Sequence, residues 1–152
     1  MSNEAILLFD TKSRQLQPLT SSDGKKLRIY SCGPTVYKDA HVGNMRTFLL
    51  GDLITRLAKQ LGHKVEFIQN ITDVGHMSED FVEDKILAQA KAESKDPFEI
   101  ARIYEERFHK DLAHLNINPA DKYPKASECI ELMQKLITLL ISKNHAYVGS
   151  DN

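Results

Sequence analysis

Residues 27–73, LRIYSCGPTVYKDAHVGNMRTFLLGDLITRLAKQLGHKVEFIQNITD, decide the fold. Apolar and polar side chains alternate over 27–32 and again over 64–71, a pattern that is typical of half-buried strands. Between these segments, apolar residues recur at helical spacing, at Leu50, Leu53, Ile54, Leu57 and Leu61. Strand, helix and strand together predict a βαβ unit in which the two strands are parallel and the crossover is right-handed.

The remaining chain is predicted to be mainly helical. A short strand is expected over 6–9, and the apolar periodicity predicts three helices, over about 81–95, 96–115 and 127–143. Asp96, followed by Pro97 and Glu99, is a helix start signal. Residues 146–148 begin a further strand. We therefore expect an α/β fold, a Rossmann-like parallel sheet with crossover helices and a helical carboxyl-terminal part.

Composition bounds the class of protein. The chain has 152 residues, 20 Lys and Arg against 21 Asp and Glu, and a formal net charge of −1. This balance argues against a general nucleic-acid binder, which usually carries a basic excess. The length suits one domain over 1–152. Because 146–148 starts a strand that the chain does not finish, we expect an interrupted domain.

The sequence predicts a cytoplasmic protein. No basic segment followed by a long apolar run opens the chain, so we expect no signal peptide and no membrane association. The longest apolar stretch, near 136–141, is far shorter than the roughly 18 residues that a membrane span needs. Two cysteines, Cys32 and Cys129, are too few for a disulfide framework.

Residues 32–44 connect the first strand of the unit to its helix. In an open parallel sheet, ligands bind beyond the carboxyl ends of the strands, and a helix N-terminus there offers unpaired N–H groups to a phosphate. His41 can donate a hydrogen bond to a phosphate oxygen, and Gly43 lets a flat nucleotide approach the backbone. Spacing alone leaves two interpretations open, a nucleotide site or an ordinary loop with a solvated histidine.

Three motifs carry a family resemblance. The segments YSCGPTVY (30–37), AHVGNMRTF (40–48) and QNITD (69–73) follow one another in order. Together they resemble the amino-terminal part of cysteinyl-tRNA synthetase, a class I aminoacyl-tRNA synthetase. Residues 41–44 are similar to the H-I-G-H signature of that class, with a different last residue. The resemblance covers nearly the whole of this chain, but only about the first third of the family protein.

The resemblance implies an activity and its partners. Members of the family use ATP to convert cysteine to cysteinyl-adenylate, and then transfer cysteine to tRNA(Cys). Zinc is the metal that binds the substrate thiolate. Most of the tRNA-binding surface is expected to lie outside this chain, and a carboxyl-terminal half acting in trans is one implied partner.

Residue roles follow from the same resemblance. Cys32 matches a zinc ligand, although Cys32 as a small apolar core residue is the alternative. Gly33 and Thr72 match positions that contact the amino acid. The ATP-binding positions are matched by Thr35, His41, Gly43 and Asn44. His41 and Asn44 are the implied catalytic residues, which stabilise the pentavalent phosphate. Cys129 matches no ligand position, and we expect it to be structural.

Departures from the family pattern bear on the activity of the isolated chain. Asn44 replaces the second histidine of the signature, and the other zinc ligands and the K-M-S-K-S loop would lie beyond residue 152. We therefore expect the isolated chain to be inactive, to hold little zinc, and to expose a sheet edge and an apolar face. Two alternatives are a free-standing module that binds nucleotide or a partner, and a related cysteine ligase that acts on a sugar amine.

Overall fold

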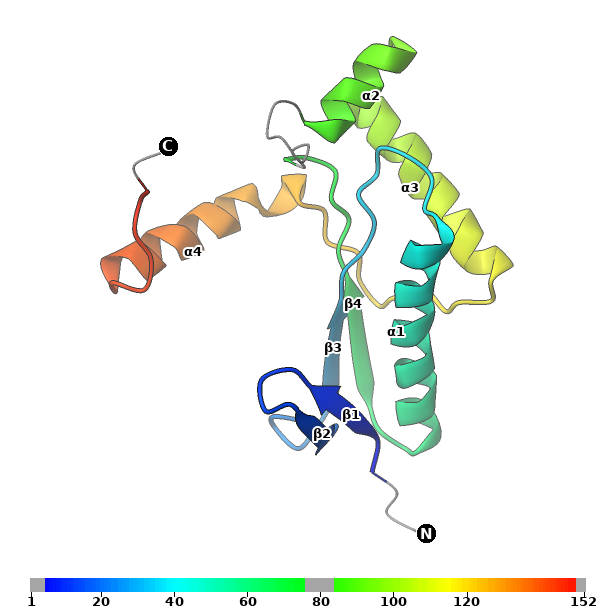
Figure 1. Ribbon diagram of the computed structural model, residues 1–152, viewed down its shortest axis with the longest axis vertical. Coiled ribbons are helices and arrows are strands. Elements are labelled where there is room, and N and C mark those ends of the chain that lie inside the picture. Colours follow the sequence, from blue (N-terminus) through cyan, green and yellow to red (C-terminus); the bar gives the residue numbers. More distant parts are fainter. Residues whose placement is uncertain (1–4, 76–83, 150–152) are drawn as a thin grey trace.

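The computed structural model describes residues 5–75 and 84–149 (Figure 1). The elements, in chain order, are β1 (Leu7–Asp10), β2 (Gln15–Pro18), β3 (Leu27–Ser31), α1 (Val42–Gln60), β4 (Val65–Gln69), α2 (Lys85–Glu93), α3 (Pro97–His114), the short 3₁₀ helix η1 (Ser127–Cys129) and α4 (Ile130–Ser142). The protein is therefore α/β with a helical carboxyl-terminal part, as the sequence predicts.

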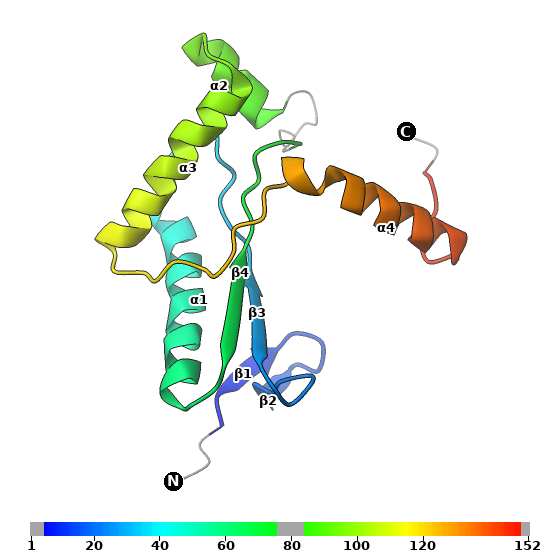
Figure 2. The same cartoon turned by 180° about the vertical axis from the view of Figure 1, so that it is seen from behind.

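The βαβ unit is confirmed. β3 and β4 pair in parallel, in a register that runs from Leu27 opposite Val65 to Ser31 opposite Gln69. The helix α1 connects the two strands and lies alongside them in both views (Figures 1 and 2). Gly62 follows α1 with a φ of +84°, the left-handed conformation expected of the glycine that ends a helix.

The two edges of this sheet differ. Along β4, the loop after α3 adds backbone hydrogen bonds, from the Gln69 N–H to the Lys122 carbonyl at 3.1 Å and from the Ile71 N–H to the Pro124 carbonyl at 2.9 Å. No strand among residues 5–75 and 84–149 pairs with the opposite edge, along β3. The predicted exposed edge is therefore present on the β3 side, whereas a loop covers the β4 side.

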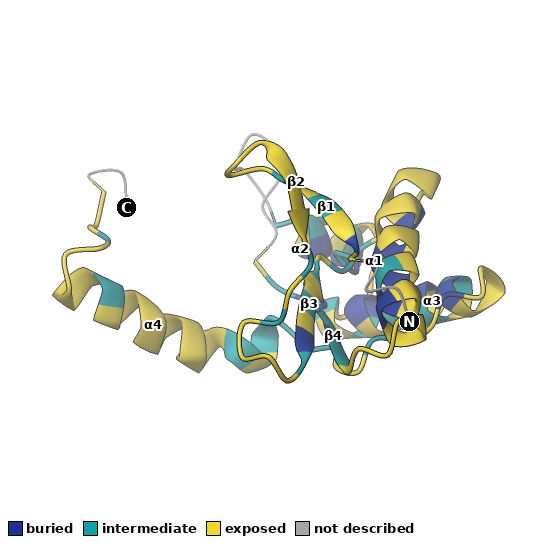
Figure 3. Cartoon of the chain, turned by 90° about the horizontal axis from the view of Figure 1, so that it is seen from below, coloured by how far each residue is buried: buried dark blue, intermediate teal, exposed yellow. Residues whose placement is uncertain are grey.

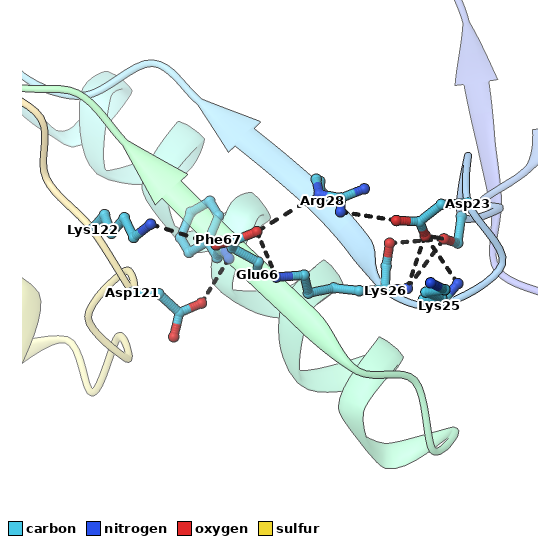
Figure 4. Close-up of polar contacts among 9 residues, drawn as sticks. Asp23, Lys25, Lys26, Arg28, Glu66, Phe67, Asp121 and Lys122 are labelled. Atoms are coloured by element: carbon cyan, nitrogen blue, oxygen red, sulfur yellow. Dashed lines mark hydrogen bonds and ion pairs between the residues drawn. The ribbon is translucent and has the colours of Figure 1, made fainter.

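Charged side chains tie this loop and β3 to β4 (Figure 4). The Glu66 carboxylate lies 2.8 Å from Lys26 Nζ and 3.7 Å from Lys122 Nζ. The hydrogen bond from Lys26 lowers the pKa of Glu66. Asp121 adds a backbone contact, because its carboxylate accepts from the Phe67 N–H at 2.7 Å. Ion pairs that remain partly exposed contribute little to stability. The contacts of Asp121 and Lys122 hold the loop against β4.

The predicted start signal at Asp96 is also confirmed. The Asp96 carboxylate accepts hydrogen bonds from the Phe98 and Glu99 N–H groups and so caps α3, with Pro97 in its first turn. Asp84 caps α2 in the same way. The expected start of that helix near residue 81 lies outside the described residues.

Two sequence predictions about strands are incomplete or wrong. β2 was not expected; it pairs antiparallel with β1, from Leu7 opposite Pro18 to Asp10 opposite Gln15. β2 has only four residues, one of them a proline, and all four are exposed, so it gives only a weak strand signal. Residues 146–148 form no strand, and Tyr147 is 90% exposed. A strand needs a neighbour, and no described strand lies beside this segment.

The buried face of α1 is not its leucine face. Packing against the sheet and α3 involves a different set, Met45, Phe48, Gly51, Asp52, Thr55 and Ala58. The leucines at helical spacing are exposed, Leu53 to 62% and Leu57 to 40%. Figure 3 colours the chain by burial and shows how few of its residues are buried. Small residues let this side of α1 approach the sheet closely, because even an added Cβ at Gly51 would lie 2.9 Å from the Phe67 ring. The helix was predicted correctly, but its polar side supplies part of the core.

A second apolar face is exposed on α4. This helix projects away from the sheet (Figure 1), and none of its residues is buried. Its exposed apolar side chains are Ile130, Leu132, Met133, Leu136, Ile137, Leu139 and Ile141. In the part of the chain that the structure describes, the uncovered apolar surface therefore lies on α1 and α4, whereas the β3–β4 sheet shows an uncovered edge but no exposed apolar face. Within residues 5–75 and 84–149, no helix is long and apolar enough to span a membrane.

The main core lies directly beneath the loops that follow β3 and β4. Val36 and Ile71, one from each loop, are 1% and 0% exposed. They pack with residues of α1, α3 and the loop beyond α3, namely Met45, Phe48, Ala101, Phe108, Leu112 and Ile117. The rings of Phe48 and Phe108 meet edge to face at 5.3 Å. Burial of these apolar anchors therefore holds both loops in place.

Candidate functional site

The loops after β3 and β4 lie side by side at the carboxyl ends of the strands. Thr35 and Thr72 form a parallel bridge. The Val36 N–H donates to the Thr72 carbonyl at 3.1 Å, and the Thr72 N–H donates to the Pro34 carbonyl at 3.0 Å. The parallel pairing of the strands thus continues into the loops. The residues predicted from the motifs at 30–37 and 69–73 therefore lie together at the carboxyl ends of the strands, where ligands bind in folds of this class.

A cavity of about 280 Å³ opens beside the first loop. Three of the four residues predicted to bind ATP line it, Thr35, His41 and Asn44. Gly43 is not part of the lining. The positions predicted to contact the amino acid, Gly33 and Thr72, lie at the strand ends outside this cavity. The structure therefore groups the predicted site residues in two neighbouring sets.

His41 is the N-cap of α1. Its Nδ1 accepts hydrogen bonds from the backbone N–H groups of Gly43 at 3.1 Å and Asn44 at 3.3 Å. In return, Asn44 Oδ1 accepts from the His41 N–H at 3.1 Å, which completes a capping box. Because Nδ1 accepts, the neutral imidazole carries its hydrogen on Nε2.

The cap changes what the helix end offers to a ligand. The sequence predicted unpaired backbone N–H groups at this helix end. The N–H groups of Gly43 and Asn44 are instead paired, because both donate to His41 Nδ1. The cap leaves two other donors unused, His41 Nε2 and the side-chain amide nitrogen of Asn44. An added Cβ at Gly43 would lie 3.0 Å from His41 Cε1, so glycine here makes room for the imidazole.

The cap makes a direct prediction about stability. His41→Ala removes the acceptor of two helix N–H groups, and we expect it to lower the free energy of unfolding by about 1 kcal/mol. His41→Asn, which restores a side-chain acceptor, should recover most of that loss. The measurement is urea unfolding followed by circular dichroism, with His63→Ala, at an exposed histidine, as the control. Equal stability of the His41→Ala and His63→Ala variants would contradict the cap.

Charged residues flank the cavity, and sequence reasoning did not single them out. Lys38 and Asp39 are part of its lining. The Lys38 ammonium lies 5.3 Å from the centre of the Tyr37 ring. Asp39 pairs with Arg107 Nη2 of α3 at 2.6 Å. The only available sequence signal was position, since Lys38 and Asp39 lie between two of the motifs.

Cys32 is exposed at the end of β3, which argues against a core role for it. Within residues 5–75 and 84–149, no three His, Cys, Asp or Glu side chains gather closely enough to hold a metal ion. A structural zinc site takes four ligands and a catalytic one takes three. The described residues therefore supply one candidate ligand and do not form a complete zinc site. Cys129 is partly buried.

Asn70 is a further residue of the site that the sequence did not reveal. Its side chain contacts Tyr30, Gly33 and Thr72. The motif 69–73 was recognised, but only Thr72 was assigned a role from it. A side-chain amide at the end of a strand gives no signal of its own in the pattern of apolar residues.

Comparisons with known proteins identify the family of this chain. The model of the family described as tRNA synthetases class I (C) catalytic domain matches residues 18–152. A cysteine–tRNA ligase of Borreliella burgdorferi (strain ZS7) is 37% identical over 149 residues, which cover 97% of this chain. Another, from Chlorobium chlorochromatii (strain CaD3), is 37% identical over 150 residues, and the one from Deinococcus radiodurans is 40% identical over 147.

The matches cover nearly all of this chain but only a part of each relative. The matched regions make up 31%, 31% and 30% of the three relatives, so this chain spans about a third of their length. Similarity to them extends from the hairpin to the carboxyl-terminal helix of this chain. The chain belongs to the family of the class I tRNA synthetase (C) catalytic domain.

Proposed function

We propose that residues 1–152 form the amino-terminal portion of the nucleotide-binding domain of a cysteine–tRNA ligase. The whole enzyme would activate cysteine with ATP and transfer it to tRNA(Cys) in the cytoplasm. One observation carries the proposal. Three residues at ATP-binding positions of the family, Thr35, His41 and Asn44, line one cavity at the carboxyl ends of parallel strands.

In this proposal the cavity holds the phosphates of ATP. His41 donates from Nε2 and Asn44 from its amide nitrogen, because the capping box already uses His41 Nδ1 and Asn44 Oδ1. The capping box fixes both side chains before ATP binds, and Gly43 leaves room for the His41 imidazole. Donors that are fixed in advance stabilise the charge that develops on phosphate more effectively than donors that must reorganise. Lys38, at the wall of the cavity, adds a positive charge.

Cysteine would bind beside ATP, at Gly33 and Thr72. Cys32 would contribute one thiolate ligand to zinc, a metal that prefers the thiol of cysteine to the hydroxyl of serine. The other zinc ligands would come from residues outside this chain, either in the same polypeptide or from a carboxyl-terminal half in trans. The exposed apolar faces of α1 and α4 are available to such a half. Most of the tRNA contacts would come from it as well.

Titration of the ¹⁵N-labelled chain with ATP and Mg²⁺ tests the nucleotide site. We expect the amide signals of Thr35, His41 and Asn44 to shift together, and Asn44→Ala to weaken binding about tenfold through loss of one charge-assisted hydrogen bond. Asn118→Ala, in an exposed loop, is the matched control. Shifts confined to other elements, or equal affinity of both variants, would remove the assignment of this cavity to ATP.

A further inference from the structure

The carboxamide of Asn70 joins the ends of β3 and β4. Asn70 Oδ1 accepts from the Tyr30 hydroxyl at 2.8 Å and from the Gly33 N–H at 3.0 Å. Asn70 Nδ2 donates to Thr72 Oγ1 at 3.1 Å. One side chain therefore contacts both positions that are implied to bind the amino acid, on two loops about 40 residues apart in the sequence.

These contacts fix the orientation of the amide. A backbone N–H can only donate, so the Asn70 atom that faces Gly33 must be the oxygen. The nitrogen then faces Thr72, and the Thr72 oxygen must accept from it. A threonine hydroxyl has one hydrogen. Because its oxygen accepts from Asn70, that hydrogen is left to donate to another group.

A neighbouring amide holds the Cys32 segment from the other side. Gln69, which is 2% exposed, donates from Nε2 to the Cys32 carbonyl at 3.2 Å. Close packing of the Gly33 backbone against Asn70 leaves little room for movement, since an added Cβ on Gly33 would lie 1.6 Å from the Asn70 carbonyl oxygen. The Cys32–Gly33 segment is therefore held by side chains on both sides and by the backbone.

From this network we infer that Asn70 is a positioning residue of the amino-acid site. It clamps the Gly33 loop to the Thr72 loop and keeps the Thr72 hydroxyl as a hydrogen-bond donor toward an acceptor group of the ligand. This inference rests on the proposed function for the identity of the ligand as an amino acid. The clamp itself depends only on the contacts of Asn70.

Amide hydrogen exchange of the chain alone tests the clamp. Asn70→Ala removes the acceptor of the Gly33 N–H, and we expect that amide to exchange about tenfold faster, together with the amides of Val36 and Thr72. Asn70→Asp keeps an acceptor for Gly33, so that amide should stay protected in a folded protein. Asn118→Asp, with the same change of charge at an exposed loop, is the control. Unchanged exchange at Gly33 in Asn70→Ala would overturn the clamp, whatever the chain binds.

Titration with L-cysteine tests the orientation of Thr72. Asn70→Asp places a carboxylate oxygen against Thr72, which turns the hydroxyl hydrogen inward. We expect Asn70→Asp and Thr72→Val each to weaken binding about tenfold, and the double variant to be no weaker than either, because both remove one donor. Additive losses, or unchanged affinity in Asn70→Asp, would overturn the positioning role. Absence of cysteine binding by the unaltered chain would count against the assignment of Gly33 and Thr72 to the amino-acid site, and the exchange result would still decide the clamp.

Discussion

Gly33→Ala is expected to lower the free energy of unfolding by roughly 3 kcal/mol or more. An added Cβ would lie 1.6 Å from the Asn70 carbonyl oxygen and 2.8 Å from the carbonyl carbon. Both are backbone atoms of the loop after β4, so no change of side-chain rotamer relieves the clash. The two loops would have to separate, and the backbone hydrogen bonds between Pro34, Val36 and Thr72 would be lost with them.

Gly51→Ala is the matched control, because it also introduces one methyl group at a glycine that another residue approaches closely. Its Cβ would lie 2.9 Å from the end of the Phe67 ring, which is a side chain that can shift. The higher helix propensity of alanine, worth about 1 kcal/mol, offsets part of this strain. Urea unfolding followed by circular dichroism measures both variants. A Gly33→Ala protein as stable as Gly51→Ala would contradict the close approach of the two loops.

Local signals explain what the sequence predicted correctly about the fold. The alternation over 27–32 and 64–71 and the cap at Asp96 each depend on residues that are close in the chain. A parallel unit then follows from the length of the crossover, because two parallel strands need a long connection. These features fix β3, α1, β4 and the start of α3 without knowledge of distant contacts.

Long-range packing explains what was missed. Leu53 and Leu57 form a regular apolar stripe, yet α1 packs through Gly51, Asp52 and Ala58 instead. Asp52 is buried because one near group and one distant group satisfy it. Arg56 Nε, one turn further along α1, lies 2.7 Å from one carboxylate oxygen, and the Asn118 N–H donates to the other at 3.3 Å. No periodicity in the sequence shows that a residue 66 positions away supplies a partner.

The positions of the proposed site residues also depend on both local signals and long-range packing. Thr35, His41 and Asn44 come together because they follow one strand and begin one helix, which the motif spacing encodes. The capping role of His41 was not predicted, since histidine is not among the residues usually preferred at a helix N-cap. The part played by Asn70 depends on how the β3 and β4 ends meet in space, which a single sequence does not specify.

Cys32→Ser is expected to have the largest effect on activity. In the proposed enzyme this thiol is one of the zinc ligands, and a serine hydroxyl is a poor replacement for a thiolate. Even changes in the groups around metal ligands cost about ten- to a hundredfold, so we expect loss of a ligand to reduce activity by about a hundredfold or more. Cys32 is exposed, so the substitution should leave stability almost unchanged.

Cys129→Ser is the control for this prediction, because it makes the same atomic change at a cysteine with no assigned role. Both variants are placed in a chimera in which this chain replaces the matching part of the Deinococcus radiodurans cysteine–tRNA ligase. The chimera supplies the two thirds of a relative that this chain does not span. It therefore tests the residues of this chain within a whole enzyme.

Cysteine-dependent exchange of pyrophosphate into ATP by this chimera is the most direct test of the proposed function. We predict that the chimera and its Cys129→Ser variant catalyse the exchange, that Cys32→Ser abolishes it, and that the chain alone shows none. A folded chimera without exchange, made from a chain that binds ATP, would indicate a free-standing nucleotide-binding module instead. Full exchange by the Cys32→Ser chimera would contradict the proposed role of this chain in cysteine activation.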